Sequence, residues 1–542
     1  MVPIVAGSLV LGVVAAPPVA AAAPLVAPAA PADPVAGPES PRGPVRDVGS
    51  PVGSVDADAQ AAARRQAPKV SIPAGPVVPQ LTDPVSVAVA EAARTGRDVM
   101  VGAQTTQTSI TWAQPDRTVR VESSAGPVRV RQGDGSWAPV DTTLQRTAVG
   151  VRPRMVPGET TFSAGGTDLL ASLSDRNGTS ITMRWGGLLP EPVIKADTAT
   201  YRDVFAGVDL VLTATRLGFT QLLVVNRAPT PLTLAALATI NIPVATTGAT
   251  VTRGKGGGLQ VVDERTGAVV GTAAAPLMWD ARRDPRTDQP VAVREVGVAV
   301  AAAVPNARSG AGPGQGTTTL SLTPDLGVFA DPATVYPVTI DPTQTLGALG
   351  DTFVQNNIAY SPQGGSTELR TGTYNGGAQV DRSLLRFDVT ALKNRNVQSA
   401  NLALFEFHSY SCSPRWVDIR EAGDFDPNTV TWPNQPWIGG ILANANVAYG
   451  YSGSCPANWV NFNLTGWAQT FSDTRNNRPN VMPLAVQVGD ERDSFAWKKF
   501  NSGNAGGNVP TLTFTFDGGC DQYNGNDLPR GIRIVDLSLL GG

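Results

Sequence analysis

The sequence predicts an all-β fold, and three observations lead to that prediction. The 57 glycines and 45 prolines among 542 residues, together with abundant valine and threonine, are typical of short strands joined by turns. Apolar residues recur at every second position in many stretches, which is the period of a half-buried strand. Two short stretches favour a helix: 85–94, which should end near Thr95-Gly96, and a single turn at 465–471.

Composition divides the chain into segments that can fold and segments that cannot. Residues 2–23 are small, apolar and alanine-rich at their end, which indicates the apolar region of a secretory signal peptide; a disordered alanine-rich terminus is the alternative. The basic residues that normally precede such a region are missing, so we expect the natural start to lie further upstream. Residues 24–82 are dominated by Pro, Ala, Val and Gly and cannot bury enough apolar surface to fold. The predicted organisation is 1–23 signal peptide, 24–84 disordered Pro/Ala-rich linker, 85–304 β-rich N-terminal module, 305–316 Gly/Pro linker, 317–350 connecting strands, 351–516 jelly roll and 517–542 C-terminal tail.

The N-terminal module reads as one or two sandwich-like units. Period-2 runs occur at 108–112, 118–122 and 128–131, and the stretch 201–226 reads as two strands around a turn at Leu217-Gly218. No long helical pattern interrupts these runs, so a β-sandwich-like region is the plain prediction.

Residues 351–516 show the clearest strand patterns. The stretch 366–389 reads as two strands joined in a hairpin by Asn375-Gly376-Gly377, residues that tolerate positive φ. Near the end of the block, Leu512, Phe514 and Phe516 alternate with threonines, and 400–407 is apolar on both faces, as expected for a central strand. We therefore expect a two-sheet jelly roll.

Composition excludes several classes of function. His408 is the sole histidine, so a Ser-His-Asp triad, a Cys-His pair or a multi-histidine metal site could not form without it. We expect His408 to be a packed strand residue rather than a catalyst. With 16% charged residues and a net charge of −3, nothing favours nucleic acid or anionic membranes as partners, and no membrane span is expected after signal removal. Carboxylate pairs remain available, so a polysaccharide hydrolase or lyase stays open as an alternative.

Aromatic and basic residues of the second block supply the candidate ligand-binding site. Several aromatic residues lie beside turns rich in proline or glycine, where an exposed ring can stack on the CH face of a sugar while polar neighbours bind its hydroxyls. The alternative is that these rings belong to the core of a sandwich. The basic residues suggest an acidic polysaccharide, scattered surface bases being the alternative. The candidate residues are Arg370, Tyr374, Trp432, Trp437, Tyr451, Trp497 and Lys498.

The three cysteines and two acidic clusters have mainly structural interpretations. In a secreted domain Cys412 and Cys455 should pair in a disulfide that contributes about 4 kcal/mol; two buried free thiols are the alternative. Cys520 is then free or pairs outside the chain. The oxygen-rich clusters 424–426 and 490–493 could hold a structural calcium ion, or they could be solvated loops. No other cofactor is expected.

Taken in order, the motifs of the second block resemble those of a known family. DTFVQ, GSTELRTGTYNGG, RSLLRFDV, SANLALFEFHSYSC, TVTWPNQP and FAWKKFNSGNAGGNVPTLTFTF occur between 351 and 516. This block resembles the DNRLRE-type domain, assigned to carbohydrate-binding module family 96 and common in secreted actinobacterial proteins. The resemblance implies a β jelly roll and, for some members, polysaccharide binding, with no shared catalytic residues.

The upstream region resembles the module that precedes such domains in Rhs or YD-repeat and LamG-type proteins. The matching stretches are SAGPVRVRQGDGSWAPVDTTL, ATYRDVFAGVDLVLTATRLGFTQLLVV and APLMWD. We therefore expect a secreted, extracellular or cell-surface protein without enzymatic activity, whose C-terminal domain binds a polysaccharide. The alternative function is a structural stalk, or a delivery module of a toxin system, without its own ligand.

Overall fold

The computed structural model describes residues 83–175, 178–302, 315–341, 344–346, 350–358 and 360–518. Several predictions fall on other parts of the chain. The predicted signal peptide, nearly all of the linker at 24–84, most of the segment at 305–316 and the tail beyond 518 with Cys520 lie outside the described residues.

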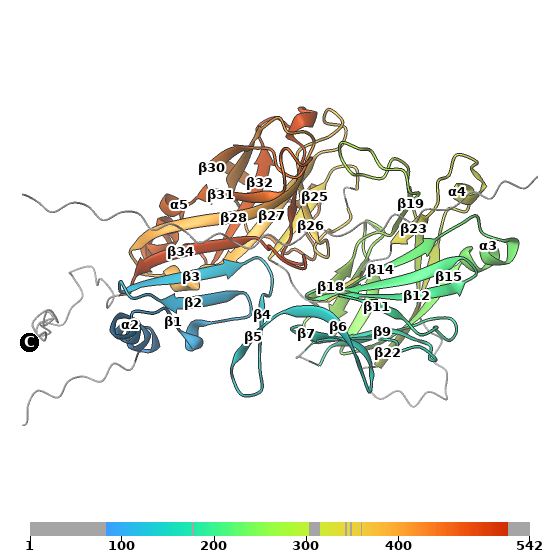
Figure 1. Ribbon diagram of the computed structural model, residues 1–542, viewed down its shortest axis with the longest axis horizontal. Coiled ribbons are helices and arrows are strands. Elements are labelled where there is room, and N and C mark those ends of the chain that lie inside the picture. The colour runs from blue at the N-terminus through green and yellow to red at the C-terminus, as the bar shows by residue number, and fades with distance from the viewer. Residues whose placement is uncertain are drawn as a thin grey trace, which may run out of the picture. The chain divides into compact units, whose positions relative to one another are not determined.

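The described residues confirm the all-β prediction. Their strands form four large sheets and one two-stranded ribbon of β4 (Arg129–Arg131) and β5 (Trp137–Pro139), and the helices are few and short (Figure 1). The strand pairs are antiparallel, as expected for strands joined by tight turns. Within this part of the chain no helix has the length and apolar character needed to cross a membrane.

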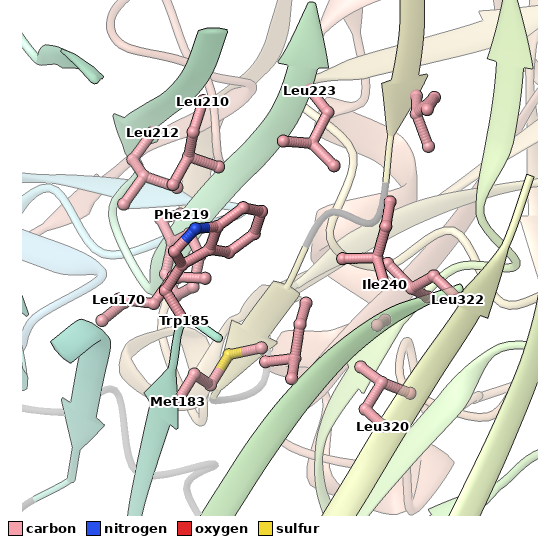
Figure 2. Packing of buried hydrophobic residues seen from close by; sticks show 14 of the residues in the cluster. Leu170, Met183, Trp185, Leu210, Leu212, Phe219, Leu223, Ile240, Leu320 and Leu322 are labelled. Atoms are coloured by element: carbon pink, nitrogen blue, oxygen red, sulfur yellow. The ribbon is translucent and has the colours of Figure 1, made fainter. Parts of the chain in front are cut away.

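Two of the large sheets pack face to face in the N-terminal sandwich, and both contribute to one apolar core. Figure 2 shows Leu170, Met183 and Ile240 of one sheet meeting Leu210 and Leu223 of the other. The first sheet contains β6 (Asp141–Thr147), β7 (Gly150–Met155), β8 (Glu159–Phe162), β9 (Leu169–Ser174), β10 (Ser180–Arg184), β15 (Ile240–Thr247), β22 (Gln315–Thr323) and β21 (Gly297–Ala302). The second contains β11 (Val193–Lys195), β12 (Thr198–Phe205), β13 (Val208–Ala214), β14 (Gly218–Val225), β16 (Ala249–Arg253), β17 (Leu259–Asp263), β18 (Val269–Ala273), β19 (Leu277–Trp279), β20 (Val293–Glu295), β23 (Val338–Asp341) and β24 (Gln344–Leu346). The N-terminal sandwich also contains two short helices, α3 (Pro231–Leu237) and α4 (Gly327–Ala330).

The other two large sheets form the C-terminal sandwich around a second apolar core. The outer strand β31 (Asn458–Asn463) pairs with the long central strand β28 (Val397–Ser409). The remaining strands of that sheet are β1 (Val99–Met100), β2 (Ser109–Ala113), β3 (Thr118–Ser124), β34 (Thr511–Asp517), β33 (Lys498–Asn501) and β26 (Glu368–Thr371). The facing sheet has the order β25 (Asp351–Gln355), β27 (Asp381–Asp388), β32 (Val481–Val488), β29 (Arg415–Ala422) and β30 (Ile438–Val447). Two α-helices, α2 (Pro84–Thr95) and α5 (Thr465–Ser472), and short 3-10 turns complete it.

The C-terminal sandwich begins far upstream in the sequence. Residues 85–124 were assigned to the N-terminal module, but in the structure β3 pairs with β34 over seven residues, from Thr118–Asp517 to Ser124–Thr511. The blue strands β2 and β3 accordingly run beside the red strand β34 (Figure 1). The whole N-terminal sandwich therefore lies, in sequence, between two neighbouring parts of the C-terminal one.

Helix α2 shows how local chemistry sets an element of this sandwich. The Asp83 carboxylate accepts a hydrogen bond from the Ser86 amide at 2.9 Å, and Gly96 ends the helix in the left-handed conformation at φ 66°. Its apolar face packs into the core of the C-terminal sandwich. This helix and α5 confirm the two helices predicted from the sequence.

The predicted hairpin at 366–389 is wrong in one respect. Its two strands form, and Gly376 and Gly377 have the expected positive φ of 68° and 96°. However, β26 pairs with β33 in one sheet, whereas β27 pairs with β25 and β32 in the other. A single bridge between Gly372 and Asp381 joins them. The connection crosses between the sheets because both strands turn apolar residues toward the same core.

The predicted disulfide between Cys412 and Cys455 is present, with 5.7 Å between the Cα atoms. It closes a loop that contains β29 and β30, the strands on which the candidate site is built.

Candidate functional site

Strand β29 presents a polar and aromatic row on the outer face of its sheet. Val417 and Ile419 are buried in the core between the sheets. Because side chains alternate along a strand, Trp416, Asp418 and Arg420 point to the opposite face. The Trp416 side chain is 51% exposed, which is unusual for a residue of its size.

Neighbouring strands extend this row with amide side chains. Asn446 of β30 lies opposite Trp416, and Asn444 lies opposite Asp418. Residues directly opposite each other in an antiparallel pair share a face, so both amides lie on the outer side. The Arg420 guanidinium donates to the Asp418 carboxylate at 3.1 Å. Asp418 itself is buried, so Arg420 is the charged group of this pair that remains partly exposed.

A second exposed indole lies at the other end of the same two strands. Trp437 is 58% exposed and immediately precedes β30, where Ala422 pairs with Ile438. Two glycines make room for its ring, since an added Cβ would lie 2.7 Å from Trp437 Nε1 at Gly423 and 3.0 Å from Trp437 Cζ3 at Gly439. Gly439 also faces Glu421, which alternates with Arg420 along β29, so the Trp437 ring lies on the other side of the strand pair from Arg420. Six residues of β29 separate the two ends, or roughly 20 Å of strand. We call Trp416, Arg420, Trp437, Asn444 and Asn446, which lie on and around the β30 edge of this sheet, the β29–β30 ribbon.

Trp432, another predicted residue, is half-buried on the loop that precedes β30. The Arg382 guanidinium lies 4.7 Å from its ring centroid. Arg382 also donates to both carboxylate oxygens of Glu491, at 2.7 and 2.8 Å, and to the Gln435 amide oxygen at 3.0 Å. These contacts fix the loop and leave Trp432 with a smaller accessible face than Trp437.

Arg370 and Tyr374 lie together, in a different place from the ribbon. The Arg370 Nε donates to the Glu368 carboxylate at 2.6 Å, and the Tyr374 hydroxyl donates to the Gln379 amide oxygen at 2.8 Å. Burial, followed by the nearby Asp381 carboxylate, raises the pKa of Tyr374. Both residues line a large cavity that is described below.

Trp497 and Lys498 are fully buried in the C-terminal sandwich. The Trp497 ring packs edge-on against Tyr374 at 5.1 Å between centroids. The Lys498 Nζ lies 3.2 Å from the Glu406 carboxylate and donates to the Ser409 hydroxyl at 2.6 Å. Burial lowers the pKa of Lys498 and raises that of Glu406. As placed, neither Trp497 nor Lys498 is accessible to a polysaccharide.

Tyr451 and His408 lie near the disulfide loop. Tyr451 is partly exposed in the turn before the Ser452–Cys455 bridge, and it follows the end of β30 at which Val447 pairs with Arg415. The His408 Nε2 is 2.8 Å from the Arg286 carbonyl oxygen. Burial, together with Lys499, lowers the pKa of His408, in agreement with a packed strand residue.

The two acidic clusters considered for calcium are engaged by arginines. Arg386 pairs with Asp424 at 2.7 Å, and Arg415 pairs with Asp493. Glu491 is held by Arg382 as described above. Across the described ranges, no group of three or more His, Cys, Asp or Glu residues is arranged to hold a metal ion.

Trp416 was not among the residues selected from the sequence, although a signal for it exists. In the run Arg415-Trp416-Val417-Asp418-Ile419-Arg420, Val and Ile alternate with polar residues, which places Trp416 on the polar face. A tryptophan on the polar face of a strand is the informative feature, because an exposed indole offers an apolar face for a ligand ring and an N–H group for hydrogen bonding.

The strands of the β29–β30 ribbon lie within a stretch that matches a known protein family. Residues 342–515 match the model of carbohydrate-binding module family 96, which supports a carbohydrate-binding module in this part of the chain. The chain is also 24% identical over 211 residues to the tRNA nuclease WapA of Bacillus subtilis (strain 168). The same identity and length relate it to the tRNA3(Ser)-specific nuclease WapA of Bacillus spizizenii. These matches cover 36% of this chain but span only 8% of the length of either relative.

Proposed function

We propose that the protein is a secreted, non-catalytic protein whose C-terminal sandwich binds a polysaccharide along the β29–β30 ribbon. Secretion is supported by the apolar N-terminal stretch and by the disulfide, since disulfides persist in oxidising compartments. The family match at 342–515 supports carbohydrate as the class of ligand.

The observation that carries the proposal is the pair of exposed indoles at the two ends of one strand pair. Trp416 and Trp437 are each more than half exposed, and such rings offer apolar faces on which sugar rings stack. Along the same strands, Arg420, Asn444 and Asn446 supply hydrogen-bond donors and acceptors for hydroxyl groups. Two exposed rings this far apart along one strand pair suit a chain of sugars better than a single small molecule.

The test is affinity electrophoresis of the full chain in gels cast with neutral and acidic polysaccharides, with and without calcium. At least one polysaccharide should retard the protein. Trp416→Ala and Trp437→Ala should each weaken that retardation about tenfold, the loss of one stacked ring being worth roughly 1 kcal/mol or slightly more. The matched control is Trp459→Ala, because Trp459 is partly exposed on β31 but packs edge-on against Phe405 at 5.4 Å.

Retardation that survives both ribbon substitutions would place the site elsewhere, and free migration of the parent in every gel would overturn the proposal. Comparing neutral with acidic gels shows whether the polysaccharide is acidic. Adding a chelator shows whether a structural calcium ion is needed.

A second candidate function is a non-catalytic surface or delivery module. It is supported by the similarity to much longer proteins named as tRNA nucleases, of which the match spans 8%. Under this alternative the protein should co-purify from its native secretome with a larger partner. Recovery as a free monomer that is retarded by a polysaccharide would favour the first proposal.

A further inference from the structure

A cavity of about 1240 Å³ lies apart from the β29–β30 ribbon. Its lining comes from strands and loops of both sandwiches, including Arg253 and Trp279 on one side and Gln355 and Arg370 on the other. Small-molecule pockets commonly enclose about 300–1,000 Å³, so this volume accommodates an oligosaccharide rather than a single small metabolite.

Charge in this cavity is opposite in sign to that of the whole chain. The protein carries a formal net charge of −3. The charged side chains that line the cavity are four carboxylates and six cations, a local excess of two positive charges. The cations are Arg253, Lys255, Arg283, Arg294, Arg370 and Lys499. A concave surface of one sign concentrates ligands of the opposite sign.

Three of these cations, Arg253, Lys255 and Arg283, form no ion pair among the described residues; Arg283 donates to the Asp288 carbonyl oxygen at 3.1 Å and lies over the Trp279 ring. Glu368 pairs with both Arg370 and Lys499, and Arg294 lies 3.8 Å from Asp325. Arg253 and Lys255 are exposed at the tip of the β16–β17 hairpin, and no ion pair is formed by either within the described residues. Their charges are therefore free to meet an anion without displacing a protein carboxylate.

The opposite wall contains a buried acceptor that lacks a donor. The Gln355 side chain is only 7% exposed, and its Nε2 donates to the Asn357 amide oxygen. That contact fixes the amide orientation, and Gln355 Oε1 has no hydrogen-bond partner in the part of the chain that is described. A buried carbonyl oxygen without a donor costs free energy, and a ligand hydroxyl would satisfy it.

Hydroxyl-binding and ring-stacking groups surround this acceptor. Asn357 donates to the Gln379 amide oxygen at 3.1 Å, and the Tyr374 hydroxyl donates to the same oxygen. The exposed ring of Tyr360 also lines the cavity. The combination of free cations, an unpaired acceptor, amides and an aromatic ring matches a sugar that carries an anionic group.

We propose that this cavity is a second saccharide site, which binds an anionic oligosaccharide through Arg253 and Lys255 and accepts a sugar hydroxyl at Gln355. The anionic group is a carboxylate or a phosphate, because both are bound by arginine and lysine. The site does not depend on the β29–β30 ribbon.

The test is isothermal titration calorimetry on the full chain carrying Trp416→Ala and Trp437→Ala, so that the ribbon contributes nothing to the signal. Three tetrasaccharides serve as probes: a uronate oligomer, an oligomer with one phosphate group, and a neutral oligomer of the same length. At least one anionic probe should bind, and 0.5 M salt should weaken this binding. Adding R253A and K255A should lower its affinity at least tenfold.

Two variants control for charge and for general effects. R253K with K255R should retain binding, since the charges remain, and R265A should have no effect, because Arg265 is an exposed cation outside the cavity. Comparing the uronate with the phosphate probe identifies the anionic group. Equal binding of the neutral probe, unchanged affinity in the R253A/K255A variant, or failure of both anionic probes to bind would overturn the proposal, whatever the ribbon does.

Discussion

Asp351, at the start of β25, is a buried carboxyl group whose environment favours its neutral form. Its Oδ2 accepts a hydrogen bond from the Gly503 amide at 2.7 Å, while Oδ1 has no partner among the described residues. Burial raises the pKa of Asp351 to about 8 from an ordinary value of 3.8. The folded protein therefore retains a proton at neutral pH that the unfolded chain releases.

This retained proton predicts a stability that falls as pH rises. The contribution of Asp351 is fully present below pH 3.8 and is lost progressively as pH approaches about 8. The loss is at most about 1.4 kcal/mol per pH unit for one group. Asp351→Asn, which mimics the neutral acid, should reduce this slope, so its advantage over the parent should grow between pH 5 and pH 7 in urea unfolding.

Asp116 provides a control of opposite sign. Hydrogen bonds from the Thr118 hydroxyl and amide lower the pKa of Asp116. Asp116→Asn should therefore lose stability relative to the parent as pH rises through the acid range toward 3.8, and the difference should then stay constant at higher pH. Parallel pH slopes for the parent and Asp351→Asn would contradict the assignment of the proton to Asp351.

Single residues differ in how far the sequence reveals them. The disulfide between Cys412 and Cys455 and the exposure of Trp437 beside prolines could be predicted, because both follow from the residues nearby in the sequence. The burial of Lys498 could not be predicted from the sequence. Its side chain meets Glu406 only because β33 and β28 pair with Phe500 opposite Glu406, and that register is set by strands far apart in the sequence.

At the scale of elements, β34 depends on a partner from the other end of the chain. Without β3, the seven residues of β34 that now pair with it would form an open sheet edge. Val121 of β3 is buried and lies between Thr111 of β2 and Phe514 of β34. The pairing thus covers an edge and extends the core.

Val121→Pro tests the contribution of this pairing. Proline removes a ladder hydrogen bond from a strand that is paired on both sides, at a cost of about 3 kcal/mol or more. For a sandwich of this size Tm should fall by about 6 °C or more. Val121→Ala keeps the backbone donor and removes only methyl groups, so its Tm should fall less in the same calorimetric scan. Equal shifts for the two variants would show that β3 does not stabilise β34 through its ladder.

Periodicity predicted individual strands better than their partners. The alternation of Leu512, Phe514 and Phe516 correctly indicated a strand with one buried face. The same kind of pattern at 366–389 indicated two strands but wrongly joined them as a hairpin, since alternation does not state which sheet each strand enters. Non-local pairing is the information that local patterns lack.

At the scale of the whole molecule, sequence order and structural order diverge. The family match begins at residue 342, whereas the sandwich that contains it also uses α2 and β1–β3, which lie before β4. The sequence predicted two β regions, and both are present. It did not predict that residues 85–124 complete the second, because nothing in those residues alone distinguishes one sheet from another.

The central claim, that a polysaccharide lies along the β29–β30 ribbon, is tested most directly by hydroxyl-radical footprinting of the full chain. The protein is labelled with and without a polysaccharide that retards it, and oxidation is measured at each aromatic residue. Trp416 and Trp437 should be protected, while Trp459, partly exposed on β31, should label equally in both samples. Unchanged labelling of Trp416 and Trp437, with protection at other aromatic residues, would contradict the account.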